Sequence, residues 1–65
     1  MKQQTAEQIR YKYCHQKCRD LREFGYNDLT VDHVYEQYDK VLAKDSDLTV
    51  IGQFIKSDFD RLEDE

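Results

Sequence analysis

Apolar residues recur at helical spacing in three segments of the chain, separated by short polar stretches. In the first, residues 6–24, one face carries Tyr11, Cys14, Cys18 and Leu21, flanked by Tyr13 and Phe24. In the second, residues 31–44, the stripe consists of Val31, Val34, Tyr38 and Val41, flanked by Tyr35 and Leu42. In the third, residues 48–62, it consists of Leu48, Ile51, Ile55, Phe59 and Leu62, with Phe54 beside them. This period predicts three amphipathic helices.

The expected ends of these helices carry residues that favour such positions. Thr5 and Gln8 have the spacing of a capping box at the start of the first helix. Gly25 can adopt the positive φ that ends a helix, and Tyr26 can then pack back on it.

The second helix is expected to start at Thr30, a good N-cap, and the third to be capped by Ser46 or Asp47. Because the connections are short, the sequence predicts an all-α protein, a compact three-helix bundle in which residues 1–65 form a single domain.

Composition agrees with a small folded protein. Hydrophobic residues make up 38% and charged residues 37% of the chain. The charge alone would suggest disorder, but the regular apolar spacing indicates a core, and its small size limits stability. The longest uncharged stretch, residues 48–55, is too short to span a bilayer, and no secretory signal is recognisable. We therefore expect a cytoplasmic protein that does not contact membranes, with reduced cysteines.

Charge is unevenly divided along the chain, although its net value is -4. Residues 8–22 hold five basic residues against one acidic residue, whereas residues 23–65 hold twelve acidic residues against four basic ones. At helical spacing, one flank of the first helix carries Lys12, His15, Arg19 and Arg22. Near aromatic residues, this flank could bind RNA phosphates. The alternative, which the net negative charge favours, is a solvated face or one that neutralises acids on the other helices.

No motif in the sequence indicates catalysis, and no cofactor is expected. Cys14 and Cys18 share a helix face, but a structural zinc site needs a second ligand pair that the chain lacks, so no metal site is expected. Asp45 begins a calcium-loop pattern that fails at Val50 and Lys56, where glycine and glutamate are required. The acidic third helix disfavours a helix-turn-helix role on DNA.

Three stretches of the chain resemble a known family. They are Phe24-Gly25-Tyr26, then Leu29 to Tyr35, and finally Leu48, Ile51 and Ile55 to Asp58. A glycine-tyrosine turn, a threonine-capped helix and a later apolar helix are similar to the small post-transcriptional regulators of competence in Gram-positive bacteria. The resemblance covers about half of the chain and implies a role linked to RNA.

The leading functional hypothesis is a non-enzymatic regulator or adaptor that docks on a protein partner, with post-transcriptional regulation as one setting. The residues expected to make this contact are Tyr35, Glu36, Asp39, Asp45 and Asp47. A second hypothesis is a phage or mobile-element inhibitor whose acidic surface blocks a nucleic-acid-binding site on its target. A third is direct RNA binding through the basic first helix. A homodimer is compatible with each.

Overall fold

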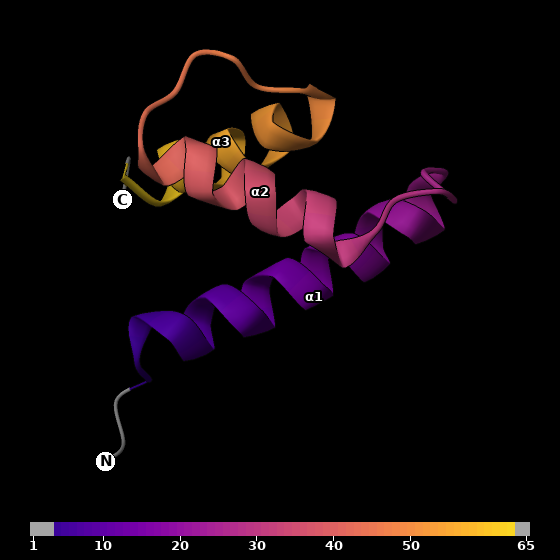
Figure 1. Cartoon of the computed structure of the whole chain (residues 1–65), viewed down its shortest axis with the longest axis horizontal. Coiled ribbons are helices and arrows are strands. Elements are labelled where there is room, and N and C mark those ends of the chain that lie inside the picture. The colour runs from indigo at the N-terminus through magenta and orange to yellow at the C-terminus, as the bar shows by residue number, and fades with distance from the viewer. Residues whose placement is uncertain (1–3, 64–65) are drawn as a thin grey trace. The chain divides into compact units, whose positions relative to one another are not determined.

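The structure is a computed structural model that describes residues 4–63, and the side chains of residues 4–61. It contains three helices, α1 (Ala6–Phe24), α2 (Val31–Leu42) and α3 (Val50–Glu63), and no strand within the described residues (Figure 1). The predicted all-α fold is therefore confirmed. The chain divides into two compact units, Met1–Tyr35 and Glu36–Glu65, called here the N-terminal and C-terminal units. The boundary falls within α2, so the N-terminal unit contains α1 and the first turn of α2.

Both predicted ends of α1 are confirmed. The Thr5 hydroxyl accepts the backbone N–H of Gln8 at 3.2 Å, and the Gln8 side chain accepts the Thr5 N–H at 3.0 Å. At the other end, Gly25 has a φ of 139°, and the N–H groups of Gly25 and Tyr26 donate to carbonyls of the last turn. The ring of Tyr26 stacks on Phe24 at 6.2 Å between centroids. These bonds satisfy backbone groups that a helix end leaves unpaired.

The start of α2 is confirmed, but its predicted end was two residues too late. The Thr30 hydroxyl accepts the His33 N–H at 3.3 Å, as expected of an N-cap. The helix ends at Leu42 because Lys44 adopts a φ of 59°, and the Asp45 N–H turns back to the Lys40 carbonyl at 2.9 Å. Glycine usually occupies this positive-φ conformation, so a lysine at position 44 gave no indication that the helix ends there.

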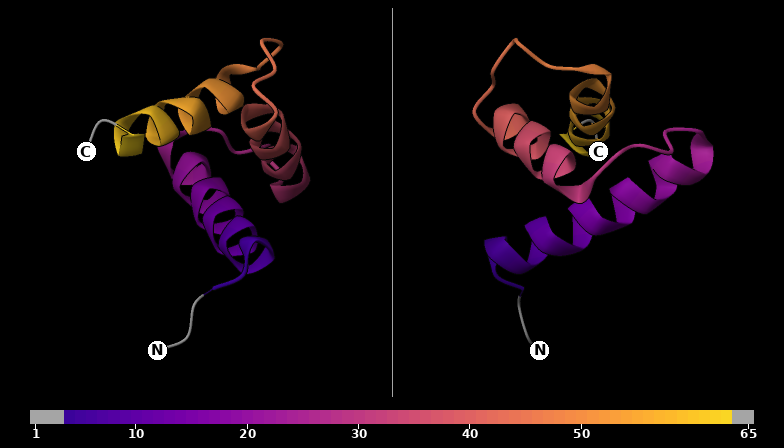
Figure 2. Two further views of the ribbon diagram at one scale, coloured as in Figure 1. Left: turned by 90° about the vertical axis from the view of Figure 1, so that its left-hand side faces the viewer. Right: turned by 45° about the vertical axis from the view of Figure 1, so that its right-hand side comes forward.

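The prediction that α3 starts at residue 48 with Ser46 or Asp47 as its cap was wrong. The helix begins at Val50, and the Asp45 carboxylate instead accepts the Asp47 N–H at 2.9 Å, which makes a turn within the loop. Figure 2 shows this loop leading from the end of α2 to the start of α3. A side chain from α2 determines the true start: the Oε1 of Gln37 accepts the Thr49 N–H at 3.0 Å.

The buried apolar residues come from the predicted stripes. They are Cys14, Cys18, Leu21 and Val34 in the N-terminal unit and Tyr38, Ile51 and Ile55 in the C-terminal unit. The ring of Tyr38 meets that of Phe59 edge to face at 5.5 Å. One expectation was wrong, since Tyr11 is 58% exposed, and sequence reasoning missed Gln37, which belongs to no predicted stripe and is fully buried. The side chain of Leu62 lies outside the described residues.

Candidate binding surfaces

The ring of Tyr35 contacts side chains of α1 and is therefore not fully exposed. The guanidinium carbon of Arg10 sits 4.3 Å from the centroid of the Tyr35 ring, and the His15 ring approaches it edge to face at 5.7 Å. Tyr35 is half-buried as a result. The sequence analysis assigned Tyr35 to the acidic docking surface and His15 to the basic flank. In the structure these two residues are in contact. Sequence reasoning missed Arg10, whose place above the ring depends on how α1 and α2 meet within the N-terminal unit.

This environment changes the acidity of the Tyr35 phenol. Partial burial raises the pKa of Tyr35 above its ordinary value of 10.0, and the nearby thiol of Cys14 acts in the same direction, whereas the Arg10 guanidinium acts against them. Burial disfavours the phenolate, and a neighbouring cation favours it. Tyr35 therefore remains neutral throughout the physiological range.

We expect the difference between the ultraviolet pH titrations of the wild type and Tyr35→Phe to show a phenol that ionises above pH 10.0. Replacing Arg10 by glutamine should raise this pKa further, because the cation that favours the phenolate is lost. Since the pKa is raised on folding, the stability that Tyr35 contributes is full below about pH 10 and is lost as pH rises through its folded value. A lowered pKa, or one that Arg10→Gln does not move, would contradict the arrangement.

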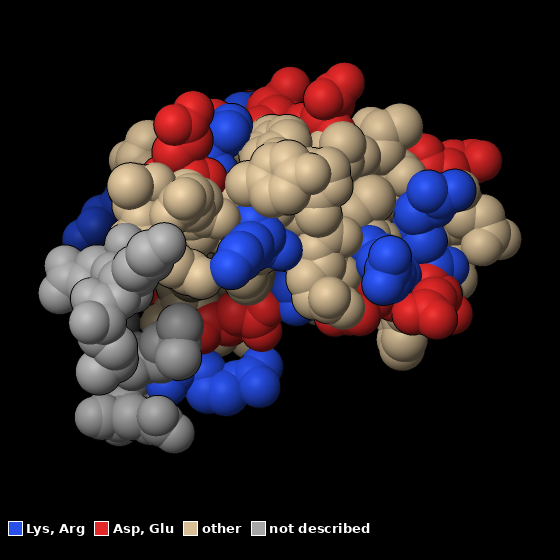
Figure 3. All heavy atoms as spheres, turned by 90° about the horizontal axis from the view of Figure 1, so that it is seen from below, with Lys and Arg blue, Asp and Glu red and all other residues tan. Residues whose placement is uncertain are grey.

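The predicted basic flank is exposed on α1. All four residues of this flank, Lys12, His15, Arg19 and Arg22, are exposed to solvent. Within residues 4–61, its lysine and its two arginines form no ion pair. By contrast, Lys56 pairs with Asp60 and Arg61 with Asp58, each at 3.2 Å. The charges on this flank are therefore exposed to solvent and are not paired with described acids of the N-terminal unit. Figure 3 shows basic and acidic side chains interspersed on the face seen from below.

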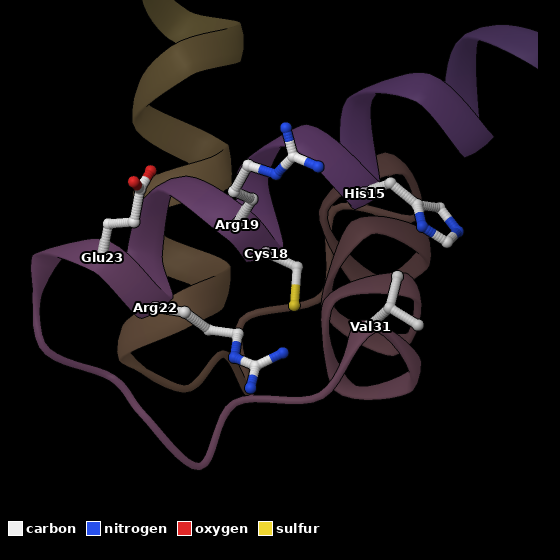
Figure 4. A pocket seen from close by; sticks show the side chains of 6 residues that line it. All are labelled: His15, Cys18, Arg19, Arg22, Glu23 and Val31. Atoms are coloured by element: carbon white, nitrogen blue, oxygen red, sulfur yellow. The ribbon is translucent and has the colours of Figure 1, made fainter.

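Beside the basic flank, an open hollow of about 640 Å³ lies between α1 and the first turn of α2. We call it the arginine hollow, and its lining residues are His15, Cys18, Arg19, Arg22, Glu23 and Val31 (Figure 4). Cys18 is held by a weak bond from its thiol to the Leu29 carbonyl at 3.8 Å. In Figure 4 the Arg22 guanidinium extends toward the Cys18 sulfur, whereas the Arg19 guanidinium and the Glu23 carboxylate both point away from it.

The acidic residues predicted for docking are exposed, namely Glu36 and Asp39 on α2 and Asp45 and Asp47 in the following loop. One of them, Asp45, lines a second hollow, of about 460 Å³, in the C-terminal unit. We call it the leucine hollow, and its lining residues are Val41, Leu42, Lys44, Asp45, Ser46, Lys56, Phe59 and Asp60. Leu42 is 57% exposed there. The sequence placed Leu42 and Phe59 on neighbouring helices but could not show that a hollow forms between them.

Cys14 and Cys18 are both buried and are not joined in a disulfide. No three histidine, cysteine, aspartate or glutamate residues of the described chain come together as metal ligands. None of its described helices combines the length and the apolar character needed to cross a bilayer.

Comparison of the chain with known protein families, with curated proteins and with solved structures finds no match. The similarity to competence regulators therefore stays a hypothesis, and the functional argument rests on the surfaces themselves.

Proposed function

We propose that the protein is a non-enzymatic regulator or adaptor that docks on a protein partner through its C-terminal unit. The observation that carries this proposal is the leucine hollow, in which exposed Leu42 lies beside half-buried Val41 and Phe59. Removing such apolar surface from water is the main favourable contribution to most protein association. A partner that inserts an apolar side chain here would cover Leu42.

The rim of the leucine hollow suits recognition of a basic partner segment. It carries charges of both signs, with Asp45 and Asp60 near Lys44 and Lys56. The C-terminal unit as a whole holds nine acidic and four basic residues, a net charge of -5. Charges at a rim steer encounter and fix orientation more than they add affinity. The partner we propose is therefore a protein segment with an apolar anchor flanked by lysine or arginine.

This proposal is tested with a partner identified by pulldown from the native host. Asp39→Lys with Asp47→Lys should slow association on the order of tenfold at low salt and weaken its salt dependence. Asp45 is left intact because its carboxylate holds the loop through the Asp47 N–H. Leu42→Ser should instead speed dissociation on the order of tenfold, since an apolar anchor mainly affects residence time.

The matched control is Glu23→Lys with Asp28→Lys, which makes the same change of charge on exposed residues of the N-terminal unit. If the control slows association as much as the Asp39 and Asp47 pair, or if Leu42→Ser leaves dissociation unchanged, docking through the leucine hollow is wrong. Tyr35→Ala is unsuitable for this test because that ring packs against Arg10 and His15.

The acidic excess of the C-terminal unit also favours a narrower version of this function, the inhibitor hypothesis. A surface of this charge can occupy a basic nucleic-acid-binding site on a target protein. Competition separates the two versions: an inhibitor of this kind is displaced from its partner by that partner's nucleic acid, whereas an adaptor binds at the same time as the nucleic acid.

A further inference from the structure

We infer that the N-terminal unit carries a second surface, which binds a short single-stranded nucleic-acid segment along the exposed flank of α1. This surface consists of the basic flank, Lys12, His15, Arg19 and Arg22, together with the adjoining Tyr11. The inference goes beyond the docking function and does not depend on it, because the residues belong to a different unit of the chain.

One end of the flank offers a ring on which a base can stack. The Tyr11 ring lies against His15 at 4.1 Å between centroids and an interplanar angle of 32°. His15 in turn meets the edge of Tyr35 at 5.7 Å. Tyr11 nevertheless remains 58% exposed, so its ring is held by a neighbour and still open to solvent. A supported, exposed aromatic ring is what bases of any sequence stack on in single-strand binding proteins.

The other end of the flank offers cations for phosphates. Arg19 and Arg22 line the arginine hollow, both are exposed, and neither forms an ion pair within residues 4–61. Their planar guanidinium groups can each donate two parallel hydrogen bonds to phosphate oxygens. Lys12 adds a third cation to the same flank, and it too forms no ion pair with the residues whose side chains are described. In Figure 4 the Arg22 guanidinium points toward the Cys18 sulfur, whereas the Arg19 guanidinium and the Glu23 carboxylate, which also line the hollow, both point away from it.

The length of the flank favours an oligonucleotide over a single nucleotide. Tyr11 and Arg22 are eleven positions apart on one helix, a rise of roughly 16 Å. One nucleotide cannot place its base on Tyr11 and its phosphate at Arg22, whereas a few linked nucleotides can. A single strand fits better than a duplex, because only unpaired bases present a free face for stacking.

Electrostatics permits this binding in the N-terminal unit but keeps it weak. That unit holds six basic and five acidic residues, a net charge of +1, whereas the C-terminal unit has a net charge of -5. The polyanion is therefore attracted by one unit and repelled by the other. We expect an affinity that falls steeply with salt, since contacts to phosphates release bound cations.

The test uses the full chain and fluorescently labelled octanucleotides of single-stranded RNA, single-stranded DNA and duplex DNA, titrated over a range of salt. The single strands should bind more tightly than the duplex. Arg19→Gln with Arg22→Gln should weaken single-strand binding and reduce the slope of log K against log salt by about 1.4, which corresponds to two lost phosphate contacts. Preference for RNA over DNA would assign RNA as the source of the strand, and equal binding would assign single strands in general.

The matched control is Lys40→Gln with Arg61→Gln, which removes the same charge from the C-terminal unit at residues that do not line the leucine hollow. It should leave the slope unchanged. Tyr11→Leu should weaken binding on the order of fivefold to tenfold, whereas Tyr11→Phe, which keeps the ring, should bind like the wild type. Circular dichroism melts confirm that each variant is folded.

Three results would overturn the inference. They are absence of single-strand binding at low salt, an equal loss in the arginine pair and its control, and full binding by Tyr11→Leu. A fourth arm uses a phosphoserine peptide: if it binds with the same arginine dependence while the oligonucleotides do not, the arginine hollow recognises a phosphorylated protein instead.

Discussion

Replacing Ile55 by alanine is expected to lower the free energy of unfolding by about 2–5 kcal/mol, the usual result of emptying a buried aliphatic position. Ile55 is the largest fully buried side chain of the described residues and lies in the middle of the α3 stripe. Removing three of its side-chain carbons leaves a cavity that a well-packed core cannot fully close. In a domain of this size such a loss is a large part of the total stability, so urea melts should show much of the protein unfolded at low denaturant.

Two variants calibrate this result. Ile55→Val removes one methylene group and should destabilise by about 0.5–1.5 kcal/mol. Val50→Ala lies on the same helix but is 56% exposed, so its effect should be small. If Ile55→Ala melts like Val50→Ala, the α3 stripe does not form a core. These variants also bear on the docking proposal, because a stable core is what holds Phe59 and the rest of the leucine hollow in place.

Replacing Gly52 by alanine is expected to destabilise the protein by about 1–3 kcal/mol, the usual range for forcing a methyl group into a filled space. In an exposed helix the same change would stabilise by about 1 kcal/mol, because alanine has the higher helix propensity. The sign reverses here because Gly52 is buried in α3. An added Cβ would overlap the Oε1 of Gln37 and lie 3.0 Å from the Cβ of Leu48.

The Gln37 side chain cannot simply move aside. It is fully buried, and its Oε1 accepts the Thr49 N–H at 3.0 Å, so displacing it would break this bond and leave a buried amide oxygen without its donor. A buried polar group that is left unsatisfied costs about 1–3 kcal/mol. Thermal melts of Gly52→Ala in the wild-type and Gln37→Ala backgrounds form a double-mutant cycle, and Gly52→Ala should be less harmful when Gln37 is absent. A stabilising effect of Gly52→Ala in the wild type would mean that the two side chains are not in contact.

The sequence by itself determined the three helices, because the signals involved are local. Capping by Thr5 and Thr30 and termination at Gly25 depend on neighbours three or four positions away, and all three are confirmed. The apolar period likewise identified most of the buried residues. Helical spacing also placed the basic residues of α1 on one flank of that helix.

Other features depended on contacts between residues distant in sequence, and only the tertiary structure decided them. The start of α3 is set by Gln37, twelve positions before the backbone group that it binds. No residue between positions 46 and 50 indicates that this bond forms. The predicted N-cap was therefore Ser46 or Asp47, which are residue types that commonly cap helices. The end of α2 was missed for a related reason, since Lys44 occupies a conformation that usually calls for glycine.

The binding surfaces show the same division. Charge along the chain could be counted from the sequence, and the two units of the structure separate it into nearly neutral and strongly acidic parts. The contacts of Tyr35 could not be predicted in this way, because Arg10 and His15 reach its ring from another helix and place it beside the basic flank. Helical periodicity places a side chain on a face of its own helix, but the residues that meet it there, and the hollows that form between helices, are decided by packing.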